Sequence, residues 1–571
     1  MEMHPIRRKR FLRSAAVVTV SCLAVLLNTP VTAGAASPGG GDQAVTDTTA
    51  QGAQGAQGAQ GAQGGGHTPP SIPGDWPSWQ KDLSGSRSNP FERRLTPGNV
   101  GKLKLKWAFA YPKNTGTPHS QPAVVGDTIY FGATDGHFYA RDARTGAAKW
   151  DFDLSTVGTP GPGGRAVVQD GAAVSGGKVY FGDGRGYFYA LEQKTGKLAW
   201  ARQIDTEIAA GITSSPIVYG GRVYVGVSSG QNILGKTFPC CTFRGHIDAL
   251  NAETGEQVWR YYTVPEPKQN GTWPNGVPRY EPSGAGVWST PAIDPVTRTL
   301  YVGTGQNYTG SGGDFDSVLA LDITTGKARW TRKMTDVDTW RIECSFPTPE
   351  DKQYCPNLPD GTALDYDLGA APNLFTAGGK HLVGIGQKAG VYHVLDARTG
   401  KIVWQRQLST PMPSGGLSGI QWGTSFDGER LYVSTYMGRP GTLFAINPAD
   451  GHILWKTPNP EDGCTTGGAA QYPNVCQLGH GPAVTTTPGL VWLGSMDGKM
   501  RAYSARTGEV LWTYDTITPV DGVNGLPGRG GAVSGAGGAV VSHGMVYVQS
   551  GYSFTPYPNP DRGSVLLAFG L

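Results

Sequence analysis

The stretch Ala320-Leu-Asp-Ile-Thr-Thr-Gly-Lys-Ala-Arg-Trp330 is one of seven similar copies along the chain. Each copy begins with Ala or Val, has Gly six residues later, and has Trp four residues after that glycine. The copies begin at Ala140, Ala190, Ala249, Ala320, Val394, Ala445 and Ala502. A pattern repeated this often indicates a repeat architecture.

Each copy follows an alternating stretch such as Arg222-Val-Tyr-Val-Gly-Val, which is typical of a β-strand. The Asp/Asn-x-x-Thr-Gly part predicts a turn, because Asp and Asn bond their own backbone and Gly tolerates positive φ. The strand after the turn ends in Trp. Each copy is therefore the last hairpin of a small antiparallel sheet.

Four-stranded units of about 40–50 residues are the signature of propeller blades, which bury their faces by packing against neighbouring blades. We expect each repeat tryptophan to lie flat between adjacent blades. An eighth unit is split: Val100–Trp107 ends in Trp without preceding strands, and Gly563–Leu571 is a strand without a following turn. Joining the two closes the ring and removes its exposed edges. The fold class is thus all-β, an eight-bladed β-propeller over residues 74–571.

The first 73 residues are predicted to lie outside this fold. Residues 1–35 combine the basic run Arg7–Arg10, the apolar run Ser14–Leu27 and an A-x-A site at Ala33–Ala35, as in an export signal. This segment contains the whole formal net charge of +4. We therefore expect a secreted or periplasmic protein without a nucleic-acid partner or a membrane span. Residues 36–73, with Gln-Gly-Ala repeats, read as a flexible linker, and Asp75–Gly101 as a lead into the ring.

The spacing between repeat tryptophans is longest from Trp200 to Trp404, within blades three to five. The extra residues fall in 230–243, 264–286 and 335–367, and one more long connection spans 457–481. Because loops on one face of a scaffold commonly carry function, these blades are the expected location of a site.

Six cysteines remain after the signal segment, an even number that predicts disulfides in an exported protein. Their spacing favours Cys344–Cys355 and Cys464–Cys476, each closing one long loop. Cys240 and Cys241 are neighbours. They either bond to each other through a strained peptide or remain free or differently bridged thiols.

Several segments together resemble the quinoprotein dehydrogenases that use pyrroloquinoline quinone (PQQ), and among them the polyvinyl-alcohol dehydrogenases. The likeness runs from about Asp75 to the C-terminus. The segments are Asp75–Trp79, Ser86–Pro90, Cys240–Gly245, Pro282–Ser289, Gly303–Gly305, Asp365–Phe375 and Gly386–Tyr392.

The resemblance implies roles for particular residues. A Cys240–Cys241 disulfide would cover one face of PQQ and Trp288, six residues before Asp294, would support the other. Asp367, or Asp365 in a different alignment, would act as general base, and Lys388 would bond the quinone oxygens and stabilise developing charge. Further expected cofactor contacts are Thr213, Arg244, Gln421 and Trp422.

The chain departs from that family at two points. The family binds PQQ through Ca²⁺ with a Glu in blade three and an Asn in blade four. The corresponding neighbourhoods in this chain contain Gln231 with Asn232, and Gln306 with Asn307. Amide oxygens can ligate calcium, so Gln231, Gln306 and Asn307 are the candidate metal ligands, but loss of the carboxylate lowers affinity. No Cys-x-x-Cys-His motif for haem c occurs in the sequence.

Two functions follow as hypotheses. The first is an exported PQQ-dependent dehydrogenase without built-in haem, which oxidises the hydroxyl groups of a small or polymeric alcohol and passes electrons to a separate acceptor. The second is a non-catalytic propeller that serves as an extracellular binding or assembly scaffold. The altered calcium positions favour the second, whereas Cys240, Cys241, Trp288, Asp367 and Lys388 together favour the first.

Overall fold

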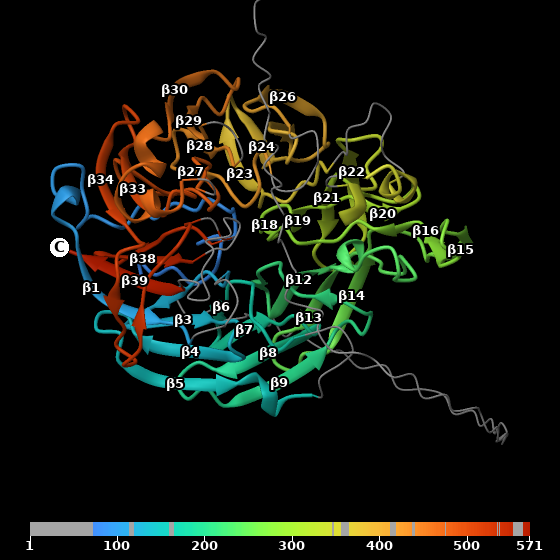
Figure 1. Cartoon of the computed structure of the whole chain (residues 1–571), viewed down its shortest axis with the longest axis horizontal. Helices are drawn as coiled ribbons and strands as arrows, with labels where there is room; N and C mark the ends of the chain where they lie inside the picture. The colour runs from blue at the N-terminus through green and yellow to red at the C-terminus, as the bar shows by residue number, and fades with distance from the viewer. Residues whose placement is uncertain are drawn as a thin grey trace, which may run out of the picture.

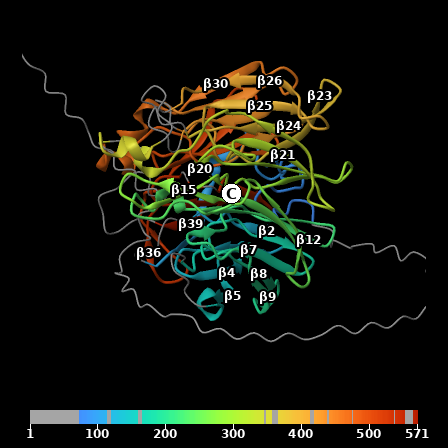
Figure 2. The same cartoon turned by 90° about the vertical axis from the view of Figure 1, so that its right-hand side faces the viewer.

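The computed structural model describes residues 72–112, 119–158, 165–344, 348–355, 365–411, 418–436, 440–473, 476–533, 535, 537–551 and 564–571. The predicted export signal 1–35 and nearly all of the predicted linker 36–73 lie outside these residues. Eight antiparallel sheets form a ring, as the sequence predicts; seven of them have four strands, and the third has a short fifth strand in addition. Blades one and two lie across the ring from blades five and six (Figures 1 and 2).

The strands of each blade follow one another from the ring's centre outward. Blade one contains β2 (Ala123–Val125), β3 (Thr128–Gly132), β4 (His137–Asp142) and β5 (Ala148–Asp153). Blade two contains β6 (Ala173–Ser175), β7 (Lys178–Gly182), β8 (Tyr187–Glu192) and β9 (Leu198–Gln203). Blade three contains β11 (Ile217–Tyr219), β12 (Arg222–Ser229), β13 (His246–Asn251) and β14 (Gln257–Tyr262). Blade four contains β18 (Ala292–Asp294), β19 (Thr299–Gly303), β21 (Ser317–Asp322) and β22 (Ala328–Lys333).

The remaining blades follow the same order. Blade five contains β23 (Asn373–Ala377), β24 (Lys380–Gly386), β25 (Val391–Asp396) and β26 (Ile402–Gln407). Blade six contains β27 (Ser425–Phe426), β28 (Leu431–Ser434), β29 (Thr442–Ile446) and β30 (Ile453–Pro458). Blade seven contains β31 (Thr485–Thr487), β32 (Leu490–Gly494), β33 (Lys499–Ser504) and β34 (Val510–Asp515). Blade eight contains β37 (Val540–Ser542), β38 (Met545–Ser550), β39 (Val565–Gly570) and β1 (Lys104–Ala110).

Shorter strands and 3-10 turns occur in addition to the four main strands of each blade. They are β10 (Ala210–Gly211), the hairpin β15 (Lys268–Thr272) with β16 (Pro278–Glu281), the pair β17 (Ser283–Gly284) with β20 (Asn307–Thr309), the pair β35 (Val520–Asp521) with β36 (Pro527–Gly528), and the 3-10 turns η1 (Val100–Lys102), η2 (Leu154–Thr156), η3 (Gln231–Ile233), η4 (Ile342–Cys344), η5 (Asp351–Tyr354), η6 (Glu461–Cys464) and η7 (Gly467–Gln471). The hairpin β15–β16 projects beyond the ring beside β20 (Figure 1). Among the described residues, no helix is both long and apolar enough to cross a membrane.

The ring is closed by strands from the two ends of the chain. β1 pairs with β39 over Lys104–Ala110, and β39 pairs with β38. The split eighth blade predicted from the sequence is thereby confirmed. Closure makes the ring continuous, so that every blade packs against a neighbouring blade on each side.

Seven repeat tryptophans dock onto the next blade, which confirms the predicted packing. The ring of Trp330, for example, lies against Gly400, and its Nε1 donates to the carbonyl of Ala397 at 3.0 Å. A Cβ at the turn glycine would overlap the indole, so the repeat requires Gly there for space as well as for its positive φ. Trp512 differs because blade eight lacks the Thr-Gly turn, and it packs edge-on against Phe569 instead.

A second contact between blades involves the last glycine of the second strand. In six blades an aliphatic residue from the segment leading into the next blade fills the space above this glycine. The pairs are Gly132 with Val168, Gly182 with Ile212, Gly226 with Val287, Gly303 with Leu368, Gly386 with Ile420, and Gly494 with Val533. This contact fixes the register of the leading segments, from which the candidate site is built.

Residues 74–89 form hydrogen bonds with the inner strands of the ring, whereas the sequence indicates only a segment that leads into the ring. Their carbonyl groups accept hydrogen bonds from the first strands of most blades. In each of the following pairs the carbonyl of the first residue accepts from the backbone N–H of the second: Pro77 and Val174, Leu83 and Ile293, Ser84 and Leu374, Ser86 and Phe426, and Arg87 and Thr486. Arg87 is buried, and its guanidinium lies 4.3 Å from the centre of the Trp79 ring.

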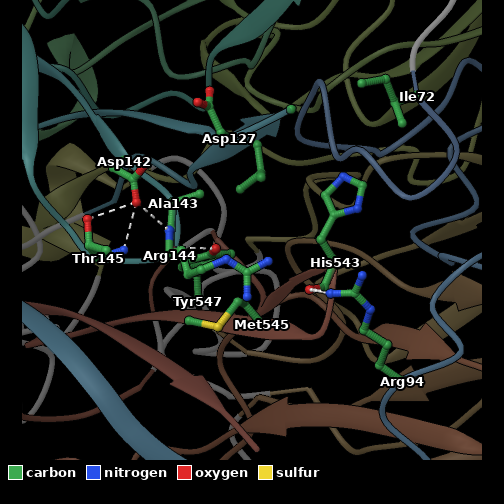
Figure 3. A pocket seen from close by; sticks show the side chains of 12 residues that line it. Ile72, Arg94, Asp127, Asp142, Ala143, Arg144, Thr145, His543, Met545 and Tyr547 are labelled. Carbon is green, nitrogen blue, oxygen red and sulfur yellow. Dashed lines mark hydrogen bonds between the residues drawn. The ribbon is translucent and has the colours of Figure 1, made fainter.

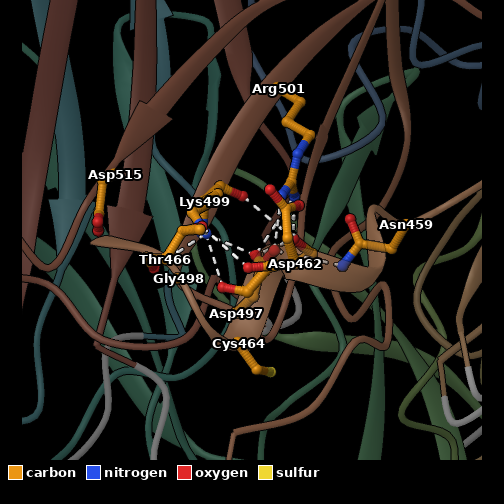
Figure 4. Close-up of polar contacts among 12 residues, drawn as sticks. Asn459, Asp462, Cys464, Thr466, Asp497, Gly498, Lys499, Arg501 and Asp515 are labelled. Carbon is orange, nitrogen blue, oxygen red and sulfur yellow. Dashed lines mark hydrogen bonds and ion pairs between the residues drawn. The ribbon is translucent and has the colours of Figure 1, made fainter. Parts of the chain in front are cut away.

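The long connection after blade six is fastened to blade seven by a buried polar network (Figure 4). Lys499 Nζ donates to the carbonyl of Gly463 at 2.6 Å and to Thr466 Oγ1 at 2.9 Å. Arg501 pairs with Asp497 at 2.6 Å. The disulfide Cys464–Cys476 closes this connection, and Cys344–Cys355 closes the one in blade five, as predicted.

Candidate functional site

Three predicted cofactor contacts occupy equivalent positions in the segments that lead into blades three, four and six. Thr213, Trp288 and Gln421 each immediately follow the aliphatic residue that packs on a strand glycine. Gly369 has the same position in the segment that leads into blade five, because it follows Leu368, which packs on Gly303. Four successive leading segments therefore present one residue each at the same level of the ring.

Trp288 is the largest side chain of this layer, and it is only half-buried. Its six-membered ring lies directly against Gly369, where a Cβ would overlap it. The ring of Trp422 meets Trp288 edge-on, with the centroids 5.2 Å apart. Lys388 Nζ lies 5.3 Å from the Trp288 ring centroid. The glycine at position 369 thus makes room for the indole.

Lys388 lies in the turn between β24 and β25 and pairs with two aspartates. Its ammonium is 2.8 Å from Asp365 Oδ1 and 2.5 Å from Asp367 Oδ2, and all three side chains are buried. Burial alone would lower the pKa of Lys388, but the two carboxylates outweigh it and raise the pKa above its ordinary value. The lysine is therefore charged, and it holds both aspartates in place.

Gln306 supports the same aspartate from blade four. Its backbone N–H donates to Asp367 Oδ1 at 2.5 Å. With the side-chain amide turned so that Nε2 faces Asp367, its Oε1 accepts from Asn232 Nδ2 at 3.2 Å. The next residue, Asn307, donates from Nδ2 to the carbonyls of Gly310 and Gly312, while its buried Oδ1 has no partner among the described residues.

Two further buried carboxyl groups lie beside this group, and sequence reasoning did not find them. Asp316 and Asp338 are fully buried, and the pKa of each is raised well above its ordinary value by burial and by neighbouring carboxylates. Asp338 accepts backbone N–H groups from Trp340 and Tyr366. Neither residue lies in the repeat pattern, so no signal in the sequence marked them.

The structure forms the disulfide between Cys240 and Cys241, across a cis peptide bond. Both residues are fully buried and pack with Val227, Phe243 and Tyr308. The carbonyl of Cys240 accepts from Trp273 Nε1 at 3.2 Å and from the backbone of Tyr280 at 3.3 Å. Tyr308 connects the two groups of residues, because it also lies near enough to Asp367 for the carboxylate to raise its pKa in addition to the effect of burial.

The other predicted residues have varied surroundings. Thr213 Oγ1 lies 2.8 Å from Ser228 Oγ. Arg244 donates to the carbonyl of Val264, and its guanidinium stacks 3.6 Å from the centre of the Tyr262 ring. Gln421 Oε1 and Trp422 Nε1 are buried without a hydrogen-bond partner among the described residues.

Gln231 uses its side-chain amide entirely within the protein. Its Oε1 accepts the backbone N–H groups of Thr242 and Phe243, at 2.9 and 3.0 Å. Its Nε2 donates to Glu207 Oε2 at 3.1 Å and to the carbonyl of Ile208 at 3.2 Å.

The three long loops of blades three to five contact one another. Lys236 pairs with Glu350 at 2.9 Å, and Asn275 Nδ2 donates to the Lys236 carbonyl at 2.8 Å. The rings of Trp273 and Tyr354 lie 6.0 Å apart. These contacts build a cap over the Cys240–Cys241 turn.

A cavity of about 410 Å³ lies at the opposite end of the blades (Figure 3). It is lined by the β2–β3, β4–β5 and β37–β38 turns, whereas Lys388 lies in a second-to-third-strand turn. Two of its polar side chains already have partners, since Asp127 contacts Lys149 and His543 contacts Asp75. None of the predicted site residues lines it.

Two family profiles match different parts of the chain. Residues 76–348 match "Glucose/ethanol/alcohol dehydrogenase, beta-propeller domain", and residues 387–559 match "Outer membrane protein assembly factor BamB". The polyvinylalcohol dehydrogenase of a Pseudomonas species is 33% identical over 531 residues, which cover 89% of this chain and 79% of that protein. The chain belongs to the PQQ-dependent alcohol dehydrogenase family.

A second relative agrees with this membership, and a solved structure shares the fold. The polyvinylalcohol dehydrogenase of a Sphingopyxis species is 34% identical over 521 residues, which cover 87% of this chain and 76% of the relative. The quinohemoprotein alcohol dehydrogenase of Comamonas testosteroni shares the fold, with a TM-score of 0.63 and 22% identity over 88% of this chain and 81% of that chain.

Proposed function

We propose that this protein is a PQQ-dependent alcohol dehydrogenase that oxidises hydroxyl groups of polyvinyl alcohol or another polyol. The observation that carries the proposal is the grouping of Trp288, Lys388, Asp365 and Asp367 in one layer of the ring. The similarity to two polyvinylalcohol dehydrogenases supports this choice of substrate class.

The residues present fit PQQ. Trp288 is an incompletely buried aromatic side chain, and a planar conjugated ring system stacks well on such a ring. Three buried polar atoms in the neighbourhood of Trp288 and Asp367 have no hydrogen-bond partner among the described residues. They are Asn307 Oδ1, Gln421 Oε1 and Trp422 Nε1. Buried polar groups are normally satisfied, so these atoms are suited to a polar ligand. Lys388 donates two of its three ammonium hydrogens to the aspartates, which leaves one for a quinone oxygen.

When bound, PQQ supplies the hydride acceptor for the alcohol carbon. Asp367 is the proposed general base that takes the hydroxyl proton onto a carboxylate oxygen. Lys388 orients that carboxylate through its 2.5 Å contact, and its positive charge stabilises negative charge developing beside it. Asp365 shares the lysine and is the alternative base. Trp288 positions the reacting groups and excludes water from one side.

The predicted calcium ligands fit less well. Gln231 Oε1 already accepts two backbone hydrogen bonds, and Gln306 Oε1 faces Asn232, which leaves Asn307 Oδ1 as the uncommitted side-chain oxygen among the three. A calcium ion normally takes 6–8 oxygen ligands. We therefore assign these residues no step that runs through calcium.

The remaining features of the proposal follow from the sequence. Electrons are proposed to pass to a separate acceptor. The predicted export signal and the two loop disulfides support a location outside the cytoplasm.

The experiment is to add PQQ, with and without Ca²⁺, to purified protein and to follow alcohol-dependent reduction of a dye. Enzymatic function predicts stoichiometric PQQ binding and turnover that requires it. Binding to neither PQQ nor alcohol under several metal ions would favour the extracellular scaffold instead.

A further inference from the structure

The side-chain amide of Gln231 is fully used inside the protein. Its oxygen accepts the consecutive N–H groups of Thr242 and Phe243, directly after the Cys240–Cys241 pair. Its nitrogen donates to Glu207 Oε2 and to the carbonyl of Ile208. An amide has two acceptor sites and two donor hydrogens, so these contacts leave nothing free for a cation.

A carboxylate could not replace this amide without a change at Glu207. A Glu side chain could still accept the two backbone hydrogen bonds. It could not donate, however, and it would place a second negative oxygen about 3.1 Å from Glu207 Oε2. Glu207 is exposed, so solvent weakens the repulsion between like charges at this distance but does not remove it. The pairing of Gln231 with Glu207 therefore selects an amide at position 231.

The turn that Gln231 holds is anchored from the other side as well. The carbonyl of Cys240 accepts from Trp273 Nε1 and from the backbone of Tyr280, both in the β15–β16 region. Gln231 thus binds residues 242 and 243 from within blade three, while the hairpin binds residue 240 from blade four's leading segment. Thr242 Oγ1 adds a bond to Glu207 Oε2 at 2.9 Å.

We propose that Gln231 is a positioning residue that fixes the Cys240–Cys241 turn, with Glu207 orienting its amide, and that it is not a metal ligand. The position of the turn beside the cofactor rests on the proposed function. The role of Gln231 in holding the turn does not rest on it, and this role can be measured in protein without PQQ.

The chain contains its own controls for the test. Reduction of each disulfide by dithiothreitol is followed by alkylation and mass spectrometry in the same sample. We expect Gln231→Ala to raise the reduction rate of Cys240–Cys241 roughly tenfold, because loss of buried hydrogen bonds makes local opening easier. The rates for Cys344–Cys355 and Cys464–Cys476 should stay unchanged, whereas general destabilisation would raise all three.

A second pair of substitutions separates positioning from metal binding. Gln231→Glu should raise the Cys240–Cys241 rate, and adding Glu207→Gln should restore it, because Gln at 207 donates to the new carboxylate. Glu207→Gln alone should have a small effect. The proposal is wrong if Gln231→Ala leaves the ratio of the three rates unchanged. It is also wrong if Gln231→Glu protects the turn only when Ca²⁺ is added, without need for the change at 207.

Discussion

The ammonium of Lys388 lies 2.5 Å from Asp367 Oδ2 in a layer where both side chains are buried. The two residues come from different places along the chain: Asp367 leads into blade five, and Lys388 lies in that blade's second turn. A third partner, Asp365, shares the lysine at 2.8 Å. The lysine's charge is thus required for the cluster to exist in this form.

Removing that charge should destabilise the protein. In Lys388→Met, two buried carboxylates lose their cation, which costs about 3–5 kcal/mol of unfolding free energy. Urea denaturation at neutral pH measures this. Lys388→Arg serves as the matched control because it keeps the charge, and a loss of similar size in both variants would show that shape rather than charge matters.

The two aspartates should differ in their effect on turnover. Asp367→Asn removes the proposed base and is expected to lower kcat by roughly 10²–10⁴-fold while PQQ binding persists. Asp365→Asn should reduce kcat much less. Steady-state kinetics on the PQQ-loaded protein compares them, and the opposite order would assign the base to Asp365.

Gly369 should matter through Trp288. An added Cβ in Gly369→Ala would overlap the indole and push it from its place. We expect PQQ affinity to fall at least about tenfold, equivalent to about 1.4 kcal/mol. Equilibrium titration measures this affinity, with Gly101→Ala in η1 as a control that, like Gly369, has no positive φ and whose Cβ would meet nothing closer than 3.8 Å. Equal affinity in all three proteins would mean that Trp288 does not contact the cofactor.

Much of the fold could be predicted because the repeat itself encodes the packing. The number of repeat tryptophans predicted the number of blades, and their recurrence with a turn glycine predicted the packing between blades. The cysteine spacing predicted two disulfides. The role of residues 74–89 was missed, because this segment has no periodicity and its hydrogen bonds reach partners hundreds of residues away. Asp316 and Asp338 were missed for a similar reason: only the fold brings them beside Asp367.

Buried histidines should make the protein sensitive to acid. Burial lowers the pKa of His393 to about 4, from an ordinary value of 6.5. The unfolded chain therefore binds the proton at higher pH than the folded protein, so stability falls as pH drops from about 6.5 toward 4. His393 contributes roughly 3 kcal/mol to this loss.

His393→Gln isolates that contribution. Its side chain can still exchange hydrogen bonds with Gln387 and Gln405, the partners of the imidazole. Urea denaturation of both proteins at neutral pH and near pH 4 should show a smaller acid-induced loss in the variant. Parallel losses would mean that His393 titrates normally in the folded protein.

PQQ-dependent alcohol oxidation tests the central claim most directly. Purified protein is loaded with PQQ and supplied with polyvinyl alcohol or a small polyol, and dye reduction is recorded beside the Asp367→Asn variant. We predict dye reduction that requires both PQQ and alcohol and that is nearly lost in the variant. Equal dye reduction in both proteins, or none in the wild type despite bound PQQ, would contradict the account.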